Sequence, residues 1–107
     1  MPKFVVALTT CPKEKSEELA LRLVEEHACA CVNIVTNVKS IYYWKDEIVT
    51  DEETLLIMKT HANRMESLWK AIKNLHPYEI PEFIVLPVMW GSKDYLDWIS
   101  SSVEETK

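Results

Sequence analysis

A histidine, a tyrosine and a glutamate lie close together in residues 75–81, whose sequence is LHPYEIP. The side chains of His76, Tyr78 and Glu79 can bind a metal ion, hold a polar ligand or move a proton. Pro77 cannot continue a helix and keeps the residue before it out of helical geometry, so the backbone here is stiff. Three interpretations of His76 stay open: a metal ligand, a member of a ligand pocket, and a structural residue that satisfies carbonyl groups at a helix end.

Three aromatic residues stand beside a lysine in residues 40–45, SIYYWK. On a strand, Tyr42 and Trp44 point to one face and Tyr43 to the other. One face can therefore pack against a neighbouring subunit while the other lines a cleft. We predict a subunit interface made of Ile41, Tyr42, Trp44 and Ile48. We also predict a small-ligand cleft between subunits made of Tyr43, Lys59, His76, Tyr78 and Glu79.

Composition argues against several other classes of function. The net charge is −5 without a basic cluster, so we expect no nucleic-acid partner. The single glycine, Gly91, leaves no glycine-rich phosphate loop, and we expect no organic cofactor. No apolar run approaches the roughly 20 residues that cross a bilayer, so we expect no membrane association. The charge run of residues 51–53 is interpreted as a solvated face.

An enzyme is not expected, because no serine or cysteine has a base at a recognisable motif spacing. A hydrolase that uses His76 with Glu79 is kept only as a second alternative. The three cysteines are interpreted as small, buried, reduced residues of the core. Met1 leads directly into a strand-like segment, which predicts no signal peptide and a cytoplasmic protein.

The apolar periodicity predicts one domain, residues 1–107, with alternating strands and helices. The first half is predicted as a strand over 3–9, a helix from Pro12 with His27 on its apolar stripe, and strands over 31–35 and 38–44 with a bulge or bend at Thr36-Asn37. It continues with a turn over 45–47 and a return strand over 48–60. The second half is predicted as a helix capped by Asn63 and ending at Pro77, a buried strand over 83–86, and a short helix capped by Ser92 with a polar tail from Ser100. This order is an α+β, ferredoxin-like βαββαβ sandwich with an extended β-hairpin and a short C-terminal helix.

The hairpin is too long for a chain of this size. Residues 31–44 would span about 46 Å if fully extended, whereas a compact domain of this length is about 33 Å across. The tip of the hairpin is therefore predicted to project and to expose apolar side chains and strand edges. Pairing with neighbouring subunits covers both, which predicts a homo-oligomer with closed cyclic symmetry.

The same residues resemble a known family, the CutA divalent-cation tolerance proteins. The resemblance covers nearly the whole chain in order. It is carried by the segments ACVNI (30–34), SIYYWK (40–45), IMKT (57–60), HPYEIPE (76–82), LPV (86–88) and DYLDW (94–98). It implies a PII-like homotrimer of ferredoxin-like subunits, cytoplasmic and linked to tolerance of divalent metal ions, copper above all.

The resemblance also implies a metal site. In bacterial relatives the proposed copper ligands are a cysteine at the end of the first strand and two consecutive histidines before Pro-Tyr. In this chain Thr9 and Leu75 occupy two of those positions and His76 the third, while Cys11 is a possible substitute. We therefore expect weak binding of Cu²⁺ or another divalent ion, with His76 and Cys11 as candidate ligands. The alternative is a PII-like signalling or scaffold trimer that binds a small molecule between its subunits.

Overall fold

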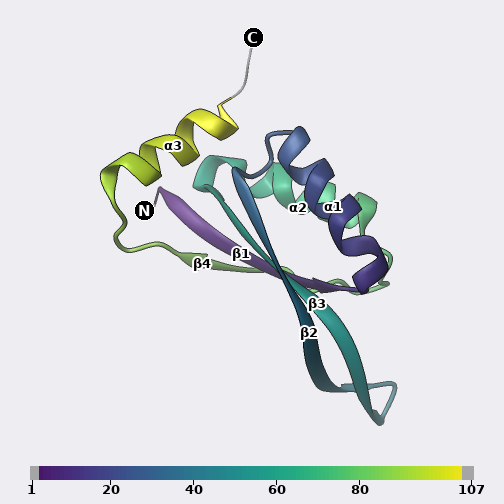
Figure 1. Cartoon of the computed structure of the whole chain (residues 1–107). Coiled ribbons are helices and arrows are strands. Elements are labelled where there is room, and N and C mark those ends of the chain that lie inside the picture. Colours follow the sequence, from purple (N-terminus) through teal and green to yellow (C-terminus); the bar gives the residue numbers. More distant parts are fainter. Residues whose placement is uncertain (1–2, 105–107) are drawn as a thin grey trace.

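One antiparallel sheet and three helices make up the protein, in a computed structural model that describes residues 3–104. The elements follow in the order β1 (Phe4–Cys11), α1 (Lys13–Glu25), β2 (Cys31–Trp44), β3 (Glu47–His61), the 3-10 helix η1 (Ala62–Arg64), α2 (Met65–Leu75), β4 (Ile84–Pro87) and α3 (Lys93–Val103). The strand order in the sheet is β2-β3-β1-β4, with every neighbouring pair antiparallel. The predicted α+β fold with its hairpin and terminal helix is confirmed (Figure 1).

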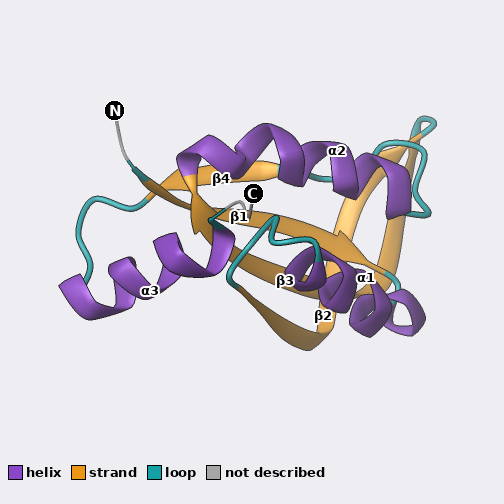
Figure 2. Ribbon diagram, turned by 90° about the horizontal axis from the view of Figure 1, so that it is seen from above, coloured by secondary structure: helices purple, strands orange, loops and turns teal. Residues whose placement is uncertain are grey.

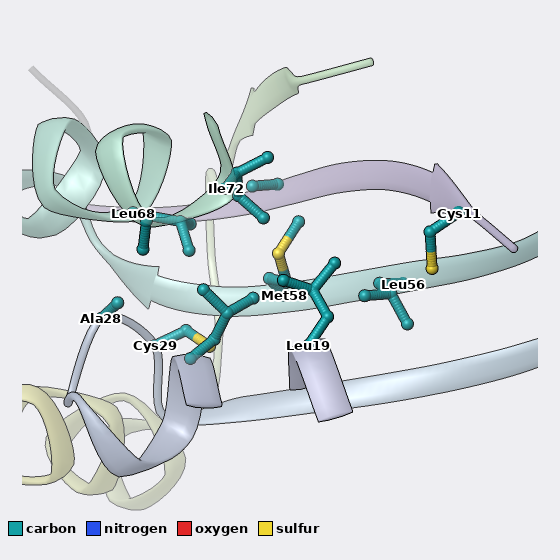
Figure 3. Packing of buried hydrophobic residues seen from close by; sticks show 11 residues of the cluster. Cys11, Leu19, Ala28, Cys29, Leu56, Met58, Leu68 and Ile72 are labelled. Carbon is teal, nitrogen blue, oxygen red and sulfur yellow. The ribbon is translucent and has the colours of Figure 1, made fainter. Parts of the chain in front are cut away.

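The main core lies between one face of the sheet and the helices α1 and α2. Alternate residues of β1 are buried, as a strand with one covered face requires. Figure 3 shows Leu19 of α1 and Leu68 of α2 packed around Met58 of β3. All three side chains are 3% exposed or less, so each contributes to the hydrophobic stabilisation of the chain.

Helix α3 lies at one end of the sheet (Figure 2). Its buried residues belong to a second, smaller hydrophobic cluster. Its residues Ile99 and Val103 are buried and contact Phe4, which points away from the main core because it alternates with Val5 on β1. The predicted polar tail from Ser100 is therefore wrong in its first residues. Val103 lies one helical turn beyond Ile99, so burying both extends the helix through its serines despite their low helical propensity.

The hairpin of β2 and β3 projects from the body of the molecule (Figure 1). Its turn has two residues rather than the predicted three, because Glu47 already pairs with Trp44. Lys45 and Asp46 both have positive φ, the backbone pattern of a type I′ turn, which matches the twist of the strands. The predicted bulge is confirmed by the shift in register between Val35 and Val38.

Three local predictions differ from the structure. Asn63 does not cap α2, because it lies in η1 and donates its backbone N–H to the His61 ring. His27 is not on the stripe of α1: it follows the helix with φ 58°, and its ring bonds to the carbonyl oxygen of Ser102. Ser92 is the N-cap residue of α3, but its hydroxyl makes no capping hydrogen bond.

The boundaries of the other elements differ by one or two residues from the predicted ones, and β1 extends to Cys11. No helix within residues 3–104 is both long and apolar enough to span a bilayer. The predicted absence of a signal peptide at Met1 and the last predicted tail residues, 105–107, lie outside the described residues.

Candidate functional site

His76 lies at the C-cap of α2, where Pro77 ends the helix. Its side chain is 8% exposed and makes two hydrogen bonds. Nε2 is 2.7 Å from the carbonyl oxygen of Thr10, and Nδ1 is 3.1 Å from the backbone nitrogen of Tyr78. A carbonyl only accepts and an N–H only donates, so Nε2 carries the proton and Nδ1 accepts. Both ring nitrogens of a neutral imidazole are therefore in use.

Tyr78 extends this arrangement to the base of the hairpin. Its hydroxyl donates to Oε2 of Glu53 over 2.7 Å, and its ring lies 4.8 Å from the His76 ring. Glu53 is 7% exposed. Burial, followed by the hydrogen bond to Glu53, raises the pKa of Tyr78. The phenol therefore keeps its proton at neutral pH and serves as a donor to the carboxylate.

A second phenol–carboxylate pair lies within the hairpin. The Tyr42 hydroxyl donates to Oδ2 of Asp51 over 2.7 Å, and this bond raises the pKa of Tyr42. Asp51 and Glu53 are two residues apart on β3 and so share one face of the strand. We call Tyr42, Asp51, Glu53, His76 and Tyr78 the hairpin-base cluster.

Sequence reasoning missed the two carboxylates of the hairpin-base cluster. The charge run of residues 51–53 was expected to be a solvated face, which describes the exposed Asp51 and Glu52 but not the buried Glu53. A signal was present, since strand alternation separates Glu52 from its two neighbours. This alternation did not show that Glu53 is buried and hydrogen bonded, because its partner Tyr78 lies 25 positions away in the sequence.

The structure separates the other residues of the predicted ligand cleft. Tyr43 is 75% exposed near the tip of the hairpin, where it pairs with Ile48. Lys59 lies six residues along β3 from Glu53, or about 20 Å, and its Nζ donates to Asn33 Oδ1. Glu79 is exposed on the loop after α2. Of this predicted set, His76 and Tyr78 are in contact within one chain, with a ring separation of 4.8 Å and a hydrogen bond.

The candidate metal ligands His76 and Cys11 do not fit a copper site within one chain. The Cys11 side chain is fully buried, and burial, followed by the charge of Glu53, raises its thiol pKa to about 11, whereas a thiolate is the form that binds metal. The lone pair of His76 Nδ1 is occupied by the Tyr78 N–H. Thr9 has a fully buried hydroxyl with no hydrogen-bond partner in the described part of the chain, but copper favours imidazole and thiolate.

No group of three or more histidine, cysteine, aspartate or glutamate side chains with the geometry of a metal site occurs within residues 3–104. The partly exposed Leu75, at the other family position, offers no donor atom. No step of a mechanism is therefore assigned to a metal ion in this chain.

The predicted interface residues are all exposed in the single chain. Ile41 and Ile48 are each 67% exposed, and Tyr42 and Trp44 are each 38% exposed. Further exposed apolar residues lie on β4 and on the loop after it. These are Ile84, Leu86, Met89 and Trp90, so the prediction that the strand over 83–86 is buried is wrong for Ile84 and Leu86, which lie on an uncovered face of the sheet.

The fold defines a class of protein: a ferredoxin-like α+β chain with a β-hairpin that projects beyond its own sheet. Residues 5–102 match the model of the family described as CutA1 divalent ion tolerance protein, and the chain belongs to this family. The divalent-cation tolerance protein CutA of Thermus thermophilus is 44% identical over 95 residues, which cover 89% of this chain and 92% of that protein.

Relatives in other organisms have the same domain. The chloroplastic protein CutA 1 of rice is 39% identical over 106 residues, which cover 99% of this chain but 60% of the rice protein. The solved structure of the PII-like protein CutA from Nostoc, in its apo form, superimposes with a TM-score of 0.89 at 41% identity. That superposition covers 94% of this chain and 97% of the Nostoc chain. The PII-like fold is thus shared at substantial sequence identity.

Proposed function

We propose that the protein is a homotrimer that acts in tolerance to divalent metal ions, copper among them, in the cytoplasm. Membership of the CutA1 family supports the link to divalent ions. The observation that supports the proposed trimer is the exposure of apolar side chains at the hairpin and along β4. Ile41 and Ile48 are 67% exposed, while Ile84 and Leu86 are about half exposed. Soluble proteins rarely leave so much clustered apolar surface in water.

A second copy of the chain is the simplest partner for both surfaces. The outer edges of β2 and β4 have no strand beside them within residues 3–104, so each leaves backbone groups for another chain to bind. When the hairpin of one subunit lies against the next in a head-to-tail manner, the ring closes at a fixed number of subunits. Three is the number that the family resemblance implies.

We propose that divalent ions bind weakly and at a site other than Cys11 and His76. The Cys11 thiol is buried, and the His76 Nδ1 atom already accepts a hydrogen bond. Surface carboxylates such as Asp51 and Glu52 can hold hard divalent ions loosely. A cytoplasmic location is supported by the three free cysteines, because reducing compartments keep thiols free.

Light scattering and calorimetry test this proposal. We expect the mass of three chains at micromolar concentration, and a mass of one chain would overturn the trimer. Titration with copper and with zinc should give weak binding that His76→Ala leaves unchanged. A stoichiometric micromolar site that His76→Ala removes would overturn the proposed mode of metal binding.

A small-molecule site between subunits is the second candidate. One observation favours it: Tyr43 is exposed near the tip of the hairpin and Tyr78 bonds Glu53 at its base, so a tip that reaches the base of a neighbouring subunit would bring the two residues together. A metabolite that raises the melting temperature of the wild type but not of Tyr43→Ala would support it. No hydrolytic role is proposed for His76 with Glu79, because Glu79 is exposed and the His76 ring bonds elsewhere.

A further inference from the structure

The projecting part of the hairpin, residues 38–53, is called the ribbon here. Among the described residues, one side-chain hydrogen bond joins the ribbon to the rest of the chain: that from the Tyr78 hydroxyl to Glu53. Glu53 pairs with Val38, the first residue of β2 beyond the bulge. The bond therefore lies where the ribbon leaves the sheet. Within one chain the ribbon lies outside the hydrophobic core, and a two-stranded ribbon without such packing is only marginally stable, so a contact at this point influences its order and direction.

Tyr78 is in turn held in place by His76. The backbone N–H of Tyr78 donates to His76 Nδ1, and the two rings are in contact at 4.8 Å. His76 Nε2 donates to the carbonyl oxygen of Thr10, at the end of β1. A continuous series of three hydrogen bonds thus connects β1, the loop after α2 and the base of the ribbon.

Two side chains of this series, those of His76 and Glu53, are shielded from water. His76 is 8% exposed and Glu53 is 7% exposed. Hydrogen bonds in such surroundings are stronger than those at the surface, and a buried carboxylate depends on its donor. Burial and the bond to Glu53 keep the Tyr78 phenol protonated, as its raised pKa indicates.

We infer that His76, Tyr78 and Glu53 form a brace that fixes the direction in which the ribbon leaves the sheet. His76 is then a positioning residue whose lone pair holds Tyr78, in place of a role as metal ligand. A metal ion at Nδ1 would compete with the Tyr78 N–H for the same lone pair. Metal coordination by His76 and a braced ribbon therefore exclude each other.

Hydrogen exchange of the backbone amides tests the brace directly. Tyr78→Phe keeps the ring and removes only the hydroxyl that binds Glu53. We expect about tenfold faster exchange in residues 38–53, because a hydrogen bond to a charged group is lost, and unchanged exchange in residues 54–60. Tyr42→Phe is the matched control: it removes a phenol–carboxylate bond of the same 2.7 Å length that lies within the ribbon. It should change ribbon exchange less than about twofold.

Three substitutions at His76 separate the brace from a metal role. The amide oxygen of His76→Asn can replace Nδ1 as an acceptor, and the amide nitrogen of His76→Gln can replace Nε2 as a donor. His76→Ala loses both bonds. We expect ribbon exchange to be fastest in the alanine variant and intermediate in the other two, with the same order when EDTA is present.

Two sets of results would overturn the brace. The first is ribbon exchange in Tyr78→Phe equal to that of the wild type, or matched by Tyr42→Phe. The second is an equal increase in ribbon exchange in all three His76 variants, together with the same increase when EDTA is added to the wild type. This result would indicate a metal ion bound to His76. Exchange is compared where light scattering gives every variant the wild-type mass, so that dissociation does not contribute. The brace lies within one chain, so a monomeric mass would overturn the trimer without affecting this test.

Discussion

Strand β3 passes through two different environments. From Thr54 to Thr60, alternate residues are buried beneath α1 and α2. From Glu47 to Glu52, no residue is buried, although Ile48 and Val49 are apolar. Residues 54–60 are therefore held by packing within their own chain. Residues 47–52, with their partners in β2, depend on the hydrogen bond at Glu53 and on the neighbouring subunit that we propose to cover their side chains.

The difference shows that one continuous strand can have two kinds of stability. The sheet region has a hydrophobic core on one face, and this core sets its register and its free energy of unfolding. The ribbon has good local geometry, with a tight turn and a bulge, but little buried area of its own. The ribbon thus has a defined backbone conformation but little stabilisation from packing within its own chain. These properties suit a segment that binds a neighbouring subunit.

The largest expected effect is in the core half of the strand. Leu56→Ala should lower the free energy of unfolding by about 2–5 kcal/mol, because Leu56 is fully buried and the substitution leaves a cavity. Urea unfolding followed by circular dichroism measures this. The matched control is Leu21→Ala on α1, where the side chain is 60% exposed and the expected change is below about 0.5 kcal/mol. Equal losses of unfolding free energy in Leu56→Ala and Leu21→Ala would show that core packing does not stabilise the sheet region of β3 as proposed.

A charge at the tip of the ribbon should act on assembly instead of on the fold of the chain. Ile48→Asp places a carboxylate at a site that is 67% exposed in one chain and that we propose to be covered in the trimer. We expect the dissociation constant to rise by roughly 10–100-fold, since desolvating an unpaired charge is costly. Sedimentation and light scattering across a dilution series measure it. Leu21→Asp should leave the mass unchanged, and an unchanged mass for Ile48→Asp would argue against an interface at the tip.

The bulge at the junction of the two regions should be sensitive to backbone conformation. Asn37 has φ 62°, which asparagine and glycine tolerate but a β-branched residue does not. Asn37→Val should therefore cost about 1–3 kcal/mol in thermal unfolding, while Asn37→Gly should change stability only slightly. If valine were tolerated as well as glycine, the bulge would not require its positive φ.

The smallest effect concerns pH and the core thiol that lies nearest to the ribbon. The pKa of Cys11 is raised from 9.0 to about 11 in the folded chain. Between these two values the folded state binds more protons than the unfolded state, so this contribution to stability is complete below about pH 9 and is lost as pH rises toward 11. We expect a loss of about 1–2 kcal/mol from this thiol across that range. Urea midpoints at several pH values should show a shallower fall for Cys11→Ala than for Cys31→Ala.

Sequence patterns predicted the body of the fold because they follow from local geometry. The order of the elements, the end of α2 at Pro77 and the bulge at Thr36-Asn37 each reflect a steric property of a few adjacent residues. The extension of α3 to Val103 was not predictable in the same way. Its serines argue against a helix, and only the packing of Ile99 and Val103 against Phe4 shows why it continues.

The candidate site was less predictable, because its parts are far apart in sequence. The sequence identified residues 75–81 as a segment with potentially functional side chains on a rigid backbone. His76 and Tyr78 are in contact in the structure. Their partners, Thr10 and Glu53, lie 66 and 25 positions away, and no spacing rule connects them. The family resemblance pointed to His76 as a metal ligand, but it could not show that both ring nitrogens were already bonded.

By itself, the sequence determined the family, the α+β topology and the length of the hairpin, since periodicity, prolines and strand length are local quantities. Only the tertiary structure decided what the residues of LHPYEIP do. Folding brings the end of β1 and the base of the ribbon to either side of this segment, which gives each polar atom of His76 and the Tyr78 hydroxyl a specific partner. Burial then makes those hydrogen bonds strong, and a group of reactive side chains becomes a structural support.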